Sequence, residues 1–458
     1  MTIPATPASA SGAESITPEL ASYYGDRRLM WRNLGLILLL NVGWSVCFTV
    51  LGPLMQLRLN YMGVSIETLG LLSGINGWVY SYAVMYFAWK SDHTVSRFGR
   101  RIPYLFLASP VIIFAVTFFS FVHAIWLLIL LTLLQMFFTD IKAAVIPLLN
   151  IDCMPRRLLA RTAAPGAIIM GLVNFMGLRF GMGLADRSET MPYILGAIIV
   201  AVVTLVAGFW IKEPPVPIPT KEKFRPWSAM KVAWKHPRTV LLMVAVALFQ
   251  TFQMVYWGWI WLYAKNVLHM SRTDIGLTTS WSILVSVALS FPIGWMIDRV
   301  SPYKILPCYC LLAGTALWFL LHISRPFDLL ITASLVAVYA SMYGAADIMV
   351  YRQSHPSEIG SVTSTNSCLR GFYNGCLGIG GGMLIEKTGG HYDYAFVAAF
   401  LLTCLGLVPL FLFRDLTGRA SKIARASEPQ AEAVPEMSGF TLARERVGLA
   451  IAPGGPQS

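Results

Sequence analysis

Long apolar runs, separated by short polar or charged connections, dominate the pattern of hydrophobic and polar positions along this chain. Each run has roughly 20 residues, enough for a helix to cross about 30 Å of hydrocarbon with its backbone hydrogen bonds satisfied internally. The pattern predicts an all-α membrane protein. Its twelve predicted transmembrane helices lie at residues 33–57, 68–89, 103–121, 124–150, 161–182, 191–211, 239–264, 273–296, 304–322, 327–351, 361–385 and 394–414.

One spacing occurs twice along the chain. Asp92 lies 22 residues after Gly70, and Asp298 lies 22 residues after Gly276, so the two pairs are 206 residues apart. A unit of about six transmembrane helices is therefore duplicated. Duplication of this kind is typical of secondary transporters, and it predicts two pseudo-symmetric six-helix bundles.

The duplication also predicts how the chain is divided. The predicted parts are an N-terminal tail (1–32), a first bundle (33–211), a linker (212–238), a second bundle (239–414) and a disordered C-terminal tail (415–458). The start of the chain has no basic region followed by a short apolar region, so no cleavable signal peptide is expected. The proline-rich, charged linker is interpreted as a cytoplasmic tether, with a short interfacial helix as the alternative.

Composition and charge agree with a membrane protein. The chain is 56% hydrophobic and 13% charged, with a mean hydropathy of +0.62. With both termini placed in the cytoplasm, 26 of the 35 Lys and Arg residues face that side and six face the other. This is the positive-inside bias of a plasma-membrane protein, most simply a bacterial inner-membrane protein. The bias accounts for the net charge of +12, so no nucleic-acid partner is expected.

The duplicated loops carry opposite charges close together. Asp92 and Asp298 each end a predicted helix on the cytoplasmic side, and arginines follow them, namely Arg97, Arg100 and Arg101 in the first half and Arg299 in the second. An aspartate that faces guanidinium groups of a neighbouring helix end makes charge-assisted hydrogen bonds. We interpret these residues as a cytoplasmic gate that opens when the halves move. The alternative is that the arginines anchor the loops to anionic lipid.

These loops resemble those of the major facilitator superfamily, in particular Gly294-Trp-Met-Ile-Asp298-Arg299. In the first half, four residues separate Asp92 from Arg97, a longer form similar to that of the glycoside–pentoside–hexuronide:cation symporters and the related sucrose transporters. The resemblance implies two six-helix bundles around a central cavity, alternating access, and transport of a sugar or glycoside with a cation. Melibiose-type members carry acids within the second helix, but residues 68–89 contain none. This difference disfavours a sodium site of that type.

Charged residues inside the predicted transmembrane helices are candidates for function, because each costs several kcal/mol to insert, about 2.5–3.5 on insertion scales. These residues are Asp140, Lys142, Asp347 and Arg370, with Arg179 nearer a helix end. Asp140 and Lys142 are two residues apart and should face different sides of one helix. We expect Asp140 to pair with Arg370 across the cavity and to bind the coupled proton, with Asp347 as a second candidate. Lys142 and Arg370 are candidates for binding solute, and static contacts between helices are the alternative.

Polar residues of the seventh and eleventh predicted helices suggest a solute site. Gln250 and Gln253 share a helical face with Trp257, and Asn374 lies in the eleventh helix. Amides can hydrogen-bond sugar hydroxyls, and an aromatic ring can pack on a sugar. An interfacial aromatic belt is the alternative interpretation. Four glycines in the eleventh helix indicate close helix packing or bending, namely Gly378, Gly380, Gly381 and Gly382.

Together these features predict a secondary active transporter, most simply a proton-coupled symporter of a sugar, glycoside or uronate. An exporter of an amphipathic metabolite or organic anion, working against protons, is the alternative. No nucleophile motif, paired His/Asp motif or metal-ligand spacing indicates an enzyme, a metal site or a cofactor. The expected partners are a small solute, a proton and the lipid bilayer, with the protein acting as a monomer.

Overall fold

A computed structural model describes residues 23–413, with the exception of 95, 155, 215–223, 225–233, 235–236, 300–301, 324 and 353–358. The side chains of Asp298, Arg299 and Asp347 also lie outside the described part of the chain. The predictions for these three residues therefore rest on the sequence alone. The described residues contain helices and connecting segments and no strand, which confirms the all-α prediction.

Helices occupy all twelve predicted ranges. The first half contains α2 (Arg27–Ser45), η1 (Val46–Leu51), α3 (Gly52–Tyr61), α4 (Ile66–Asp92), α5 (Ile102–Phe119), α6 (Ile125–Cys153), α7 (Arg156–Arg187) and α8 (Met191–Trp210). The second half contains α10 (Pro237–Phe249), α11 (Thr251–Asn266), α12 (Arg272–Arg299), α13 (Pro302–Leu321), α14 (Pro326–Arg352), α15 (Ile359–Lys387) and α16 (Tyr392–Leu405). The first predicted transmembrane helix is built from α2, η1 and α3, and the seventh from α10 and α11.

Local capping explains where several helices begin. The Asp26 carboxylate accepts hydrogen bonds from the backbone amides of Arg28 and Leu29 (3.0 and 3.1 Å), so α2 begins at Arg27, ahead of the predicted start at residue 33. Ser65 caps α4 by accepting from the amide of Thr68 (3.2 Å). Pro103 lies in the first turn of α5, where its fixed φ suits a helix start.

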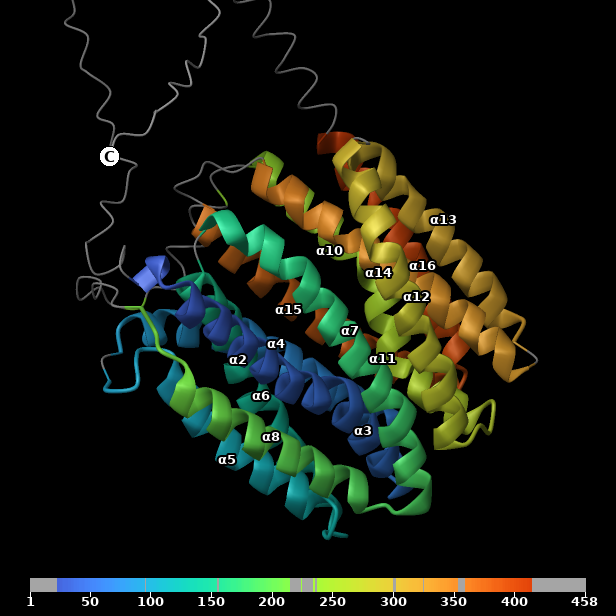
Figure 1. Cartoon of the computed structure of the whole chain (residues 1–458). Helices are drawn as coiled ribbons and strands as arrows, with labels where there is room; N and C mark the ends of the chain where they lie inside the picture. Colours follow the sequence, from blue (N-terminus) through green and yellow to red (C-terminus); the bar gives the residue numbers. More distant parts are fainter. Residues whose placement is uncertain are drawn as a thin grey trace, which may run out of the picture. The chain divides into compact units, whose positions relative to one another are not determined.

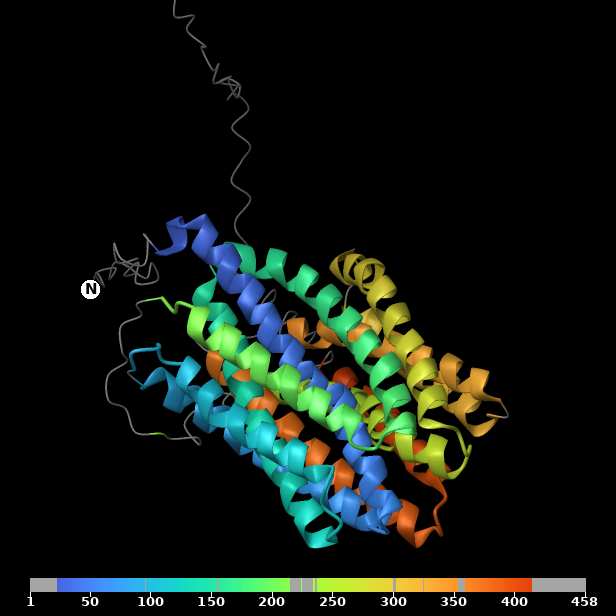
Figure 2. The same cartoon turned by 60° about the horizontal axis from the view of Figure 1, so that its bottom comes forward.

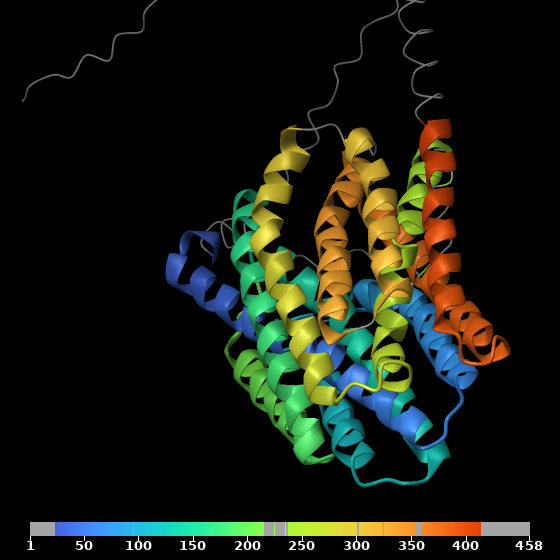
Figure 3. The ribbon, with the colours of Figure 1, turned by 90° about the vertical axis from the view of Figure 1, so that its right-hand side faces the viewer.

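Each half packs mainly against itself. In the first half, α5 contacts α6 and α8, and α4 contacts α6. In the second half, α14 contacts α12 and α13, and α11 contacts α16. Figures 1 and 3 show the first-half helices, blue to green, gathered on one side and most of the yellow to red second-half helices on the other. The two bundles belong to one compact unit.

Two helix pairs form the main contacts between the bundles. The pair α4 and α15 forms the broadest helix–helix contact among the described residues, α7 with α12 forms the second broad contact between the bundles, and α3 with α11 adds a smaller one. Figure 2 shows the orange α15 running alongside the blue α4. Seven described helices are long and apolar enough to cross a membrane, and α4 and α15 are not among them. Because these two helices pack on protein over much of their length, they carry more glycine and polar residues than a lipid-facing helix would.

The helix ends fall into two groups at opposite ends of the bundles. At one end, which we call the Asp92 end, the Tyr24 hydroxyl donates to the carbonyl of Asp152 (2.9 Å), next to the C-terminus of α6. At the same end, the Tyr23 hydroxyl donates to the carbonyl of Lys212, just after α8 (2.8 Å). We call the opposite end, where α3 finishes and α4 begins, the Asn60 end.

Candidate functional site

The predicted midplane acid is buried between helices. Asp140 of α6 is 8% exposed, and its Oδ2 atom has no hydrogen-bond partner in the described part of the chain. A carboxyl oxygen shielded from water without a donor is costly when the group is charged. The position is therefore suited to binding a proton or a hydrogen-bond donor from a solute.

Tyr80 connects Asp140 with Arg370. This tyrosine of α4 interacts electrostatically with both charged side chains, which come from α6 and α15. It also packs on Gly371, where an added Cβ would lie 3.1 Å from Tyr80 Cδ1. The contact between α4 and α15 thus brings the acid and the base predicted to pair to the same phenol. A direct ion pair between Asp140 and Arg370 stays a prediction.

Lys142 lies in the interior of the first bundle. It is 2% exposed, and its Nζ donates to the Thr204 hydroxyl of α8 at 3.3 Å. Thr204 in turn shares a hydrogen bond with Ser109 of α5 (2.9 Å), and the ammonium interacts with the Cys47 thiol of η1. Lys142 therefore interacts with α8 and η1, whereas Asp140 interacts electrostatically with Tyr80 of α4. The predicted divergence of the two side chains agrees with these contacts, and a solute-binding role for Lys142 stays a prediction.

The first and seventh transmembrane helices are both irregular at equivalent positions. A π-helix, η1, interrupts the first helix directly after Ser45, and the seventh breaks at Gln250, directly before Thr251. Ser45 and Thr251 are 206 residues apart, the spacing that relates the two halves. Interrupted helices in transporters commonly mark the binding site, because they release backbone groups toward the cavity.

A hydroxyl hydrogen bond supports each irregular turn. Ser45 Oγ donates to Asn174 Oδ1 of α7, and Thr251 Oγ1 is 2.7 Å from the Tyr373 hydroxyl of α15. The amide of Phe252 also donates to Thr403 of α16 (3.1 Å). The sequence did not predict these hydrogen-bond pairings, although the 206-residue relation between Ser45 and Thr251 was a usable signal.

Several predicted solute ligands lie near this break. Gln250 is 2% exposed, and Gln253 carries a buried Oε1 without a hydrogen-bond partner among the described residues. Trp44, the counterpart of Gln250 in the first half, likewise has a buried Nε1 without a partner there. Asn374 follows Tyr373 on α15 and is partly buried. The Gln253 oxygen and the Trp44 indole are therefore available to hydrogen-bond a polar solute.

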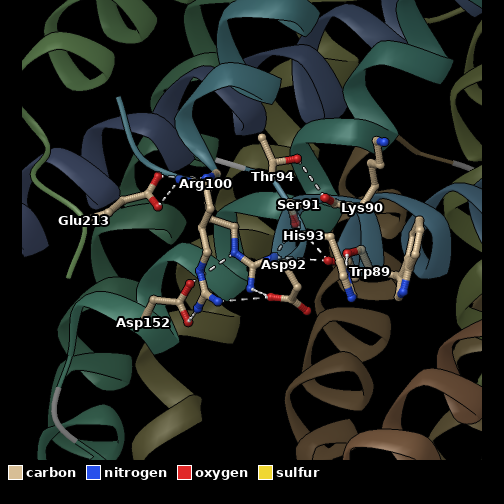
Figure 4. Close-up of polar contacts among 11 residues, drawn as sticks. Trp89, Lys90, Ser91, Asp92, His93, Thr94, Arg100, Asp152 and Glu213 are labelled. Carbon is tan, nitrogen blue, oxygen red and sulfur yellow. Dashed lines mark hydrogen bonds and ion pairs between the residues drawn. The ribbon is translucent and has the colours of Figure 1, made fainter. Parts of the chain in front are cut away.

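Three of the six predicted gate residues, Asp92, Arg100 and Arg101, belong to an ion-pair network at the Asp92 end (Figure 4). Arg100 lies 2.7 Å from Asp152 and 3.5 Å from Asp92, and Arg101 bonds the same two carboxylates, with its Nε 3.1 Å from Asp152. Arg101 is 2% exposed and also donates to the Ser91 hydroxyl and to the carbonyl of Ala88. Asp152 was not predicted, because it lies 51 residues from Arg101 in sequence.

Glu213 completes this network by capping α5. Its carboxylate accepts hydrogen bonds from the backbone amides of Arg100 (2.7 Å), Arg101 (2.9 Å) and Ile102 (2.9 Å). An anion at a helix N-terminus is favoured by the unpaired amides and by the helix dipole. Gly99 precedes the cap with a φ of +107°, and a Cβ there would collide with the Glu213 carboxylate. Glycine is therefore required at this turn.

Among the described residues, the members of the network come from the first bundle and, in the case of Glu213, from the start of the linker. Arg97, predicted to join it, instead lies with its guanidinium 4.8 Å from the centre of the Phe98 ring. The network fixes the ends of α4, α5, α6 and α8 relative to one another. Its role as a gate against the second bundle stays a prediction.

Burial raises the pKa of the Glu213 carboxyl above its ordinary value of 4.5, and the three backbone donors offset this effect only in part. The folded state therefore holds the proton more tightly than the unfolded state does. Stability should be highest below the ordinary value and should fall as the pH rises through the raised one. Glu213→Gln should remove this fall in the thermal unfolding midpoint as the pH rises above 4.5. Glu67→Gln, at an exposed glutamate of α4, is the control, and a fall that persists in Glu213→Gln would contradict the assignment.

Comparison with solved structures agrees with this architecture. A bacterial homolog of the human lysosomal transporter Spinster, solved inward-facing and unoccupied, is 14% identical with a TM-score of 0.65, over 85% of this chain and 98% of that chain. The nucleoside transporter NupG is 14% identical with a TM-score of 0.61, over 85% of this chain and 99% of that chain. At this identity the likeness concerns the fold.

Comparison of the sequence with protein families gives the assignment. No curated protein matches the chain. The pattern of the Major Facilitator Superfamily matches residues 35–271 and 242–452, which together include both bundles. The fold, the duplicated halves and this match agree: the chain is a multi-pass membrane protein that belongs to the major facilitator superfamily of transporters.

Proposed function

We propose that this protein is a proton-coupled symporter that imports a sugar, glycoside or uronate by alternating access. We place it near the glycoside–pentoside–hexuronide:cation symporters, in a bacterial inner membrane with both termini in the cytoplasm. The observation that carries the proposal is the buried Asp140 carboxyl, which has an unpartnered oxygen among the described residues and shares Tyr80 with Arg370. An acid and a base linked in this way provide a route from proton binding to solute binding.

The coupling step follows from these charges. While Asp140 is ionised, its negative charge attracts the Arg370 guanidinium, and Tyr80 interacts electrostatically with both groups. Protonation neutralises Asp140 and leaves the guanidinium to donate hydrogen bonds to a solute hydroxyl or carboxylate. Gln253 and Asn374 then supply amide donors and acceptors. Between Glu67 and Asp92 the second transmembrane helix has no acid, which favours a proton over sodium as the coupled ion.

Solute-driven proton movement in proteoliposomes tests the proposal. A panel of mono-, di- and trisaccharides and uronates should contain a solute that alkalinises the outer medium. Nucleosides belong in the panel because they carry a sugar and because NupG shares the fold. Asp140→Asn should abolish the proton signal but retain solute counterflow, which requires no net proton movement. Asp274→Asn, at an exposed aspartate of the Asn60 end, should behave like the parent protein.

Each alternative predicts a different result. A signal driven by a sodium gradient, or a proton signal that survives Asp140→Asn, would remove Asp140 as the coupling site. No response to any panel member by a folded protein would reject the sugar assignment. It would favour the exporter of an organic anion, a solute that Arg370 and Lys142 could also bind.

A further inference from the structure

The helices α7 and α15 end in the same unusual way. The penultimate residue of each is acidic and the last is basic: Asp186 precedes Arg187, and Glu386 precedes Lys387. The two acids are 200 residues apart and occupy equivalent helices of the two halves. The C-terminus of a helix carries partial negative charge, so an acid in the last turn is unfavourable for its own helix. A compensating contact should therefore exist elsewhere.

Each acid finds that contact at the start of a helix in the other bundle. Glu386 accepts a hydrogen bond from the backbone amide of Ile66, the first residue of α4 (3.0 Å). Asp186 accepts from the amide and the hydroxyl of Thr273, in the first turn of α12 (both 2.7 Å). Both carboxylates thus lie at the positive end of a helix dipole, where an anion is stabilised.

The helices α4 and α12, whose first turns bind these carboxylates, are N-capped in the same way. Ser65 and Ser271, which are 206 residues apart, precede α4 and α12. Each serine hydroxyl accepts from the amide three residues later, that of Thr68 (3.2 Å) or Asp274 (3.0 Å). One amide of each first turn is thereby satisfied within its own bundle, and another is left for the incoming carboxylate.

The same end of the molecule brings equivalent asparagines together. Asn60 and Asn266 are 206 residues apart, and Asn266 Nδ2 donates to Asn60 Oδ1 at 3.0 Å. Gln56 of α3 also donates to the carbonyl of Gly258 of α11 (3.0 Å). A residue that contacts its own counterpart lies near the axis that relates the two halves. The two carboxylate contacts are therefore equivalent contacts about this axis.

We propose that Asp186 and Glu386 are the locking residues of an outer clasp, formed by Asn60, Asn266 and the contacts of the two carboxylates with α4 and α12. The clasp closes the Asn60 end and releases when the protein opens there to take up solute. The inference rests on the alternating access proposed above, in which the Asn60 end faces outward. Both carboxylates are exposed side chains, so water can replace their helix contacts when the bundles separate.

Cysteine cross-linking tests the clasp without a solute or a proton gradient. In an Asn60→Cys/Asn266→Cys variant, mild oxidation should link the two cysteines, and mass spectrometry of the linked peptides gives the rate. Adding Asp186→Asn and Glu386→Gln should slow this rate by about fivefold to tenfold, because both helix contacts lose their charge. Each single neutralisation should give an intermediate rate.

Matched variants separate the clasp from general destabilisation. Asp328→Asn neutralises a carboxylate at the same end that accepts from the amide of Arg325 in its own bundle, and it should leave the rate unchanged. The exchange Asp186→Glu/Glu386→Asp keeps both charges and should retain most of the parent rate. An unchanged rate in the doubly neutralised, folded protein would overturn the proposal. Because no transport is measured, failure to find a solute would leave the result intact.

Discussion

Replacing Gly77 by leucine is expected to lower transport by about fivefold or more while both bundles remain folded. Gly77 lies on the face of α4 that packs on α15, and a Cβ there would lie 2.6 Å from the backbone nitrogen of Gly375 and 2.8 Å from the carbonyl oxygen of Gly371. Backbone atoms cannot rotate away as a side chain can. The two helices would have to separate, and the closed Asn60 end depends on their approach.

The expected magnitude follows from the cost of overpacking. Forcing extra methylene groups into a close contact typically costs about 1–3 kcal/mol, which shifts a conformational equilibrium by roughly 5- to 150-fold. Solute counterflow should fall by a factor of this order, and cross-linking of Asn60→Cys with Asn266→Cys should fall with it. Thermal unfolding should change little, because each bundle retains its own core.

The same helix pair offers a matched control. Gly380 lies on α15, and a Cβ there meets nothing within 4 Å, so Gly380→Leu should leave counterflow and cross-linking at parent levels. Full activity of Gly77→Leu would show that close approach of α4 and α15 is not required for the transport cycle.

The glycine run shows what sequence could predict about packing. Close packing was predicted for the run in the eleventh transmembrane helix, and Gly378 and Gly382 do face Gly70 of α4 at backbone distance. Gly380 faces open space, and Gly381 packs on Trp259 of α11. The residue type thus indicated a close approach, but helical periodicity alone could not identify the partner helix.

The transmembrane helices were predictable because hydropathy reports contact with lipid, and the duplication was visible as a constant spacing. The break at Gln250 and the π-helix after Ser45 could not be predicted. Both interrupt apolar runs whose composition favours a continuous helix. Glu213 was also missed. Its importance arises from three amides of a helix more than 100 residues away, and no local pattern records such a contact.

The candidate site was likewise predictable from the sequence only in part. Charges inside the membrane identified Asp140, Lys142 and Arg370, because their placement is costly whatever their partners are. Periodicity separated Asp140 from Lys142 but could not say which of them faces the second bundle. The electrostatic interaction of Tyr80 with both Asp140 and Arg370 supplies that information, since it requires α4, α6 and α15 to be placed together.

Removing Arg101 is expected to have the largest effect on stability of any single change at the Asp92 end. Its side chain is 3% exposed and bonds Asp152, which is 13% exposed. Arg101→Ala would leave that aspartate facing Arg100 alone, without its Arg101 hydrogen bond. Breaking a buried pair and leaving its charge uncompensated costs about 3–5 kcal/mol, and the expected loss is smaller here because Arg100 still lies 2.7 Å from Asp152. The bond to Asp92 adds little, because that side chain is 37% exposed and solvent screens it.

Thermal unfolding of the purified protein should therefore show a clear order of midpoints. Arg101→Ala should be lowest. Arg101→Lys should be intermediate, because lysine keeps the charge but cannot reproduce the planar fork that reaches both carboxylates. Arg97→Ala should stay close to the parent, since Arg97 is exposed and lies over the Phe98 ring. Equal midpoints for Arg101→Ala and Arg97→Ala would mean that the network does not hold the first bundle together, and its residues would then be explained better as lipid anchors.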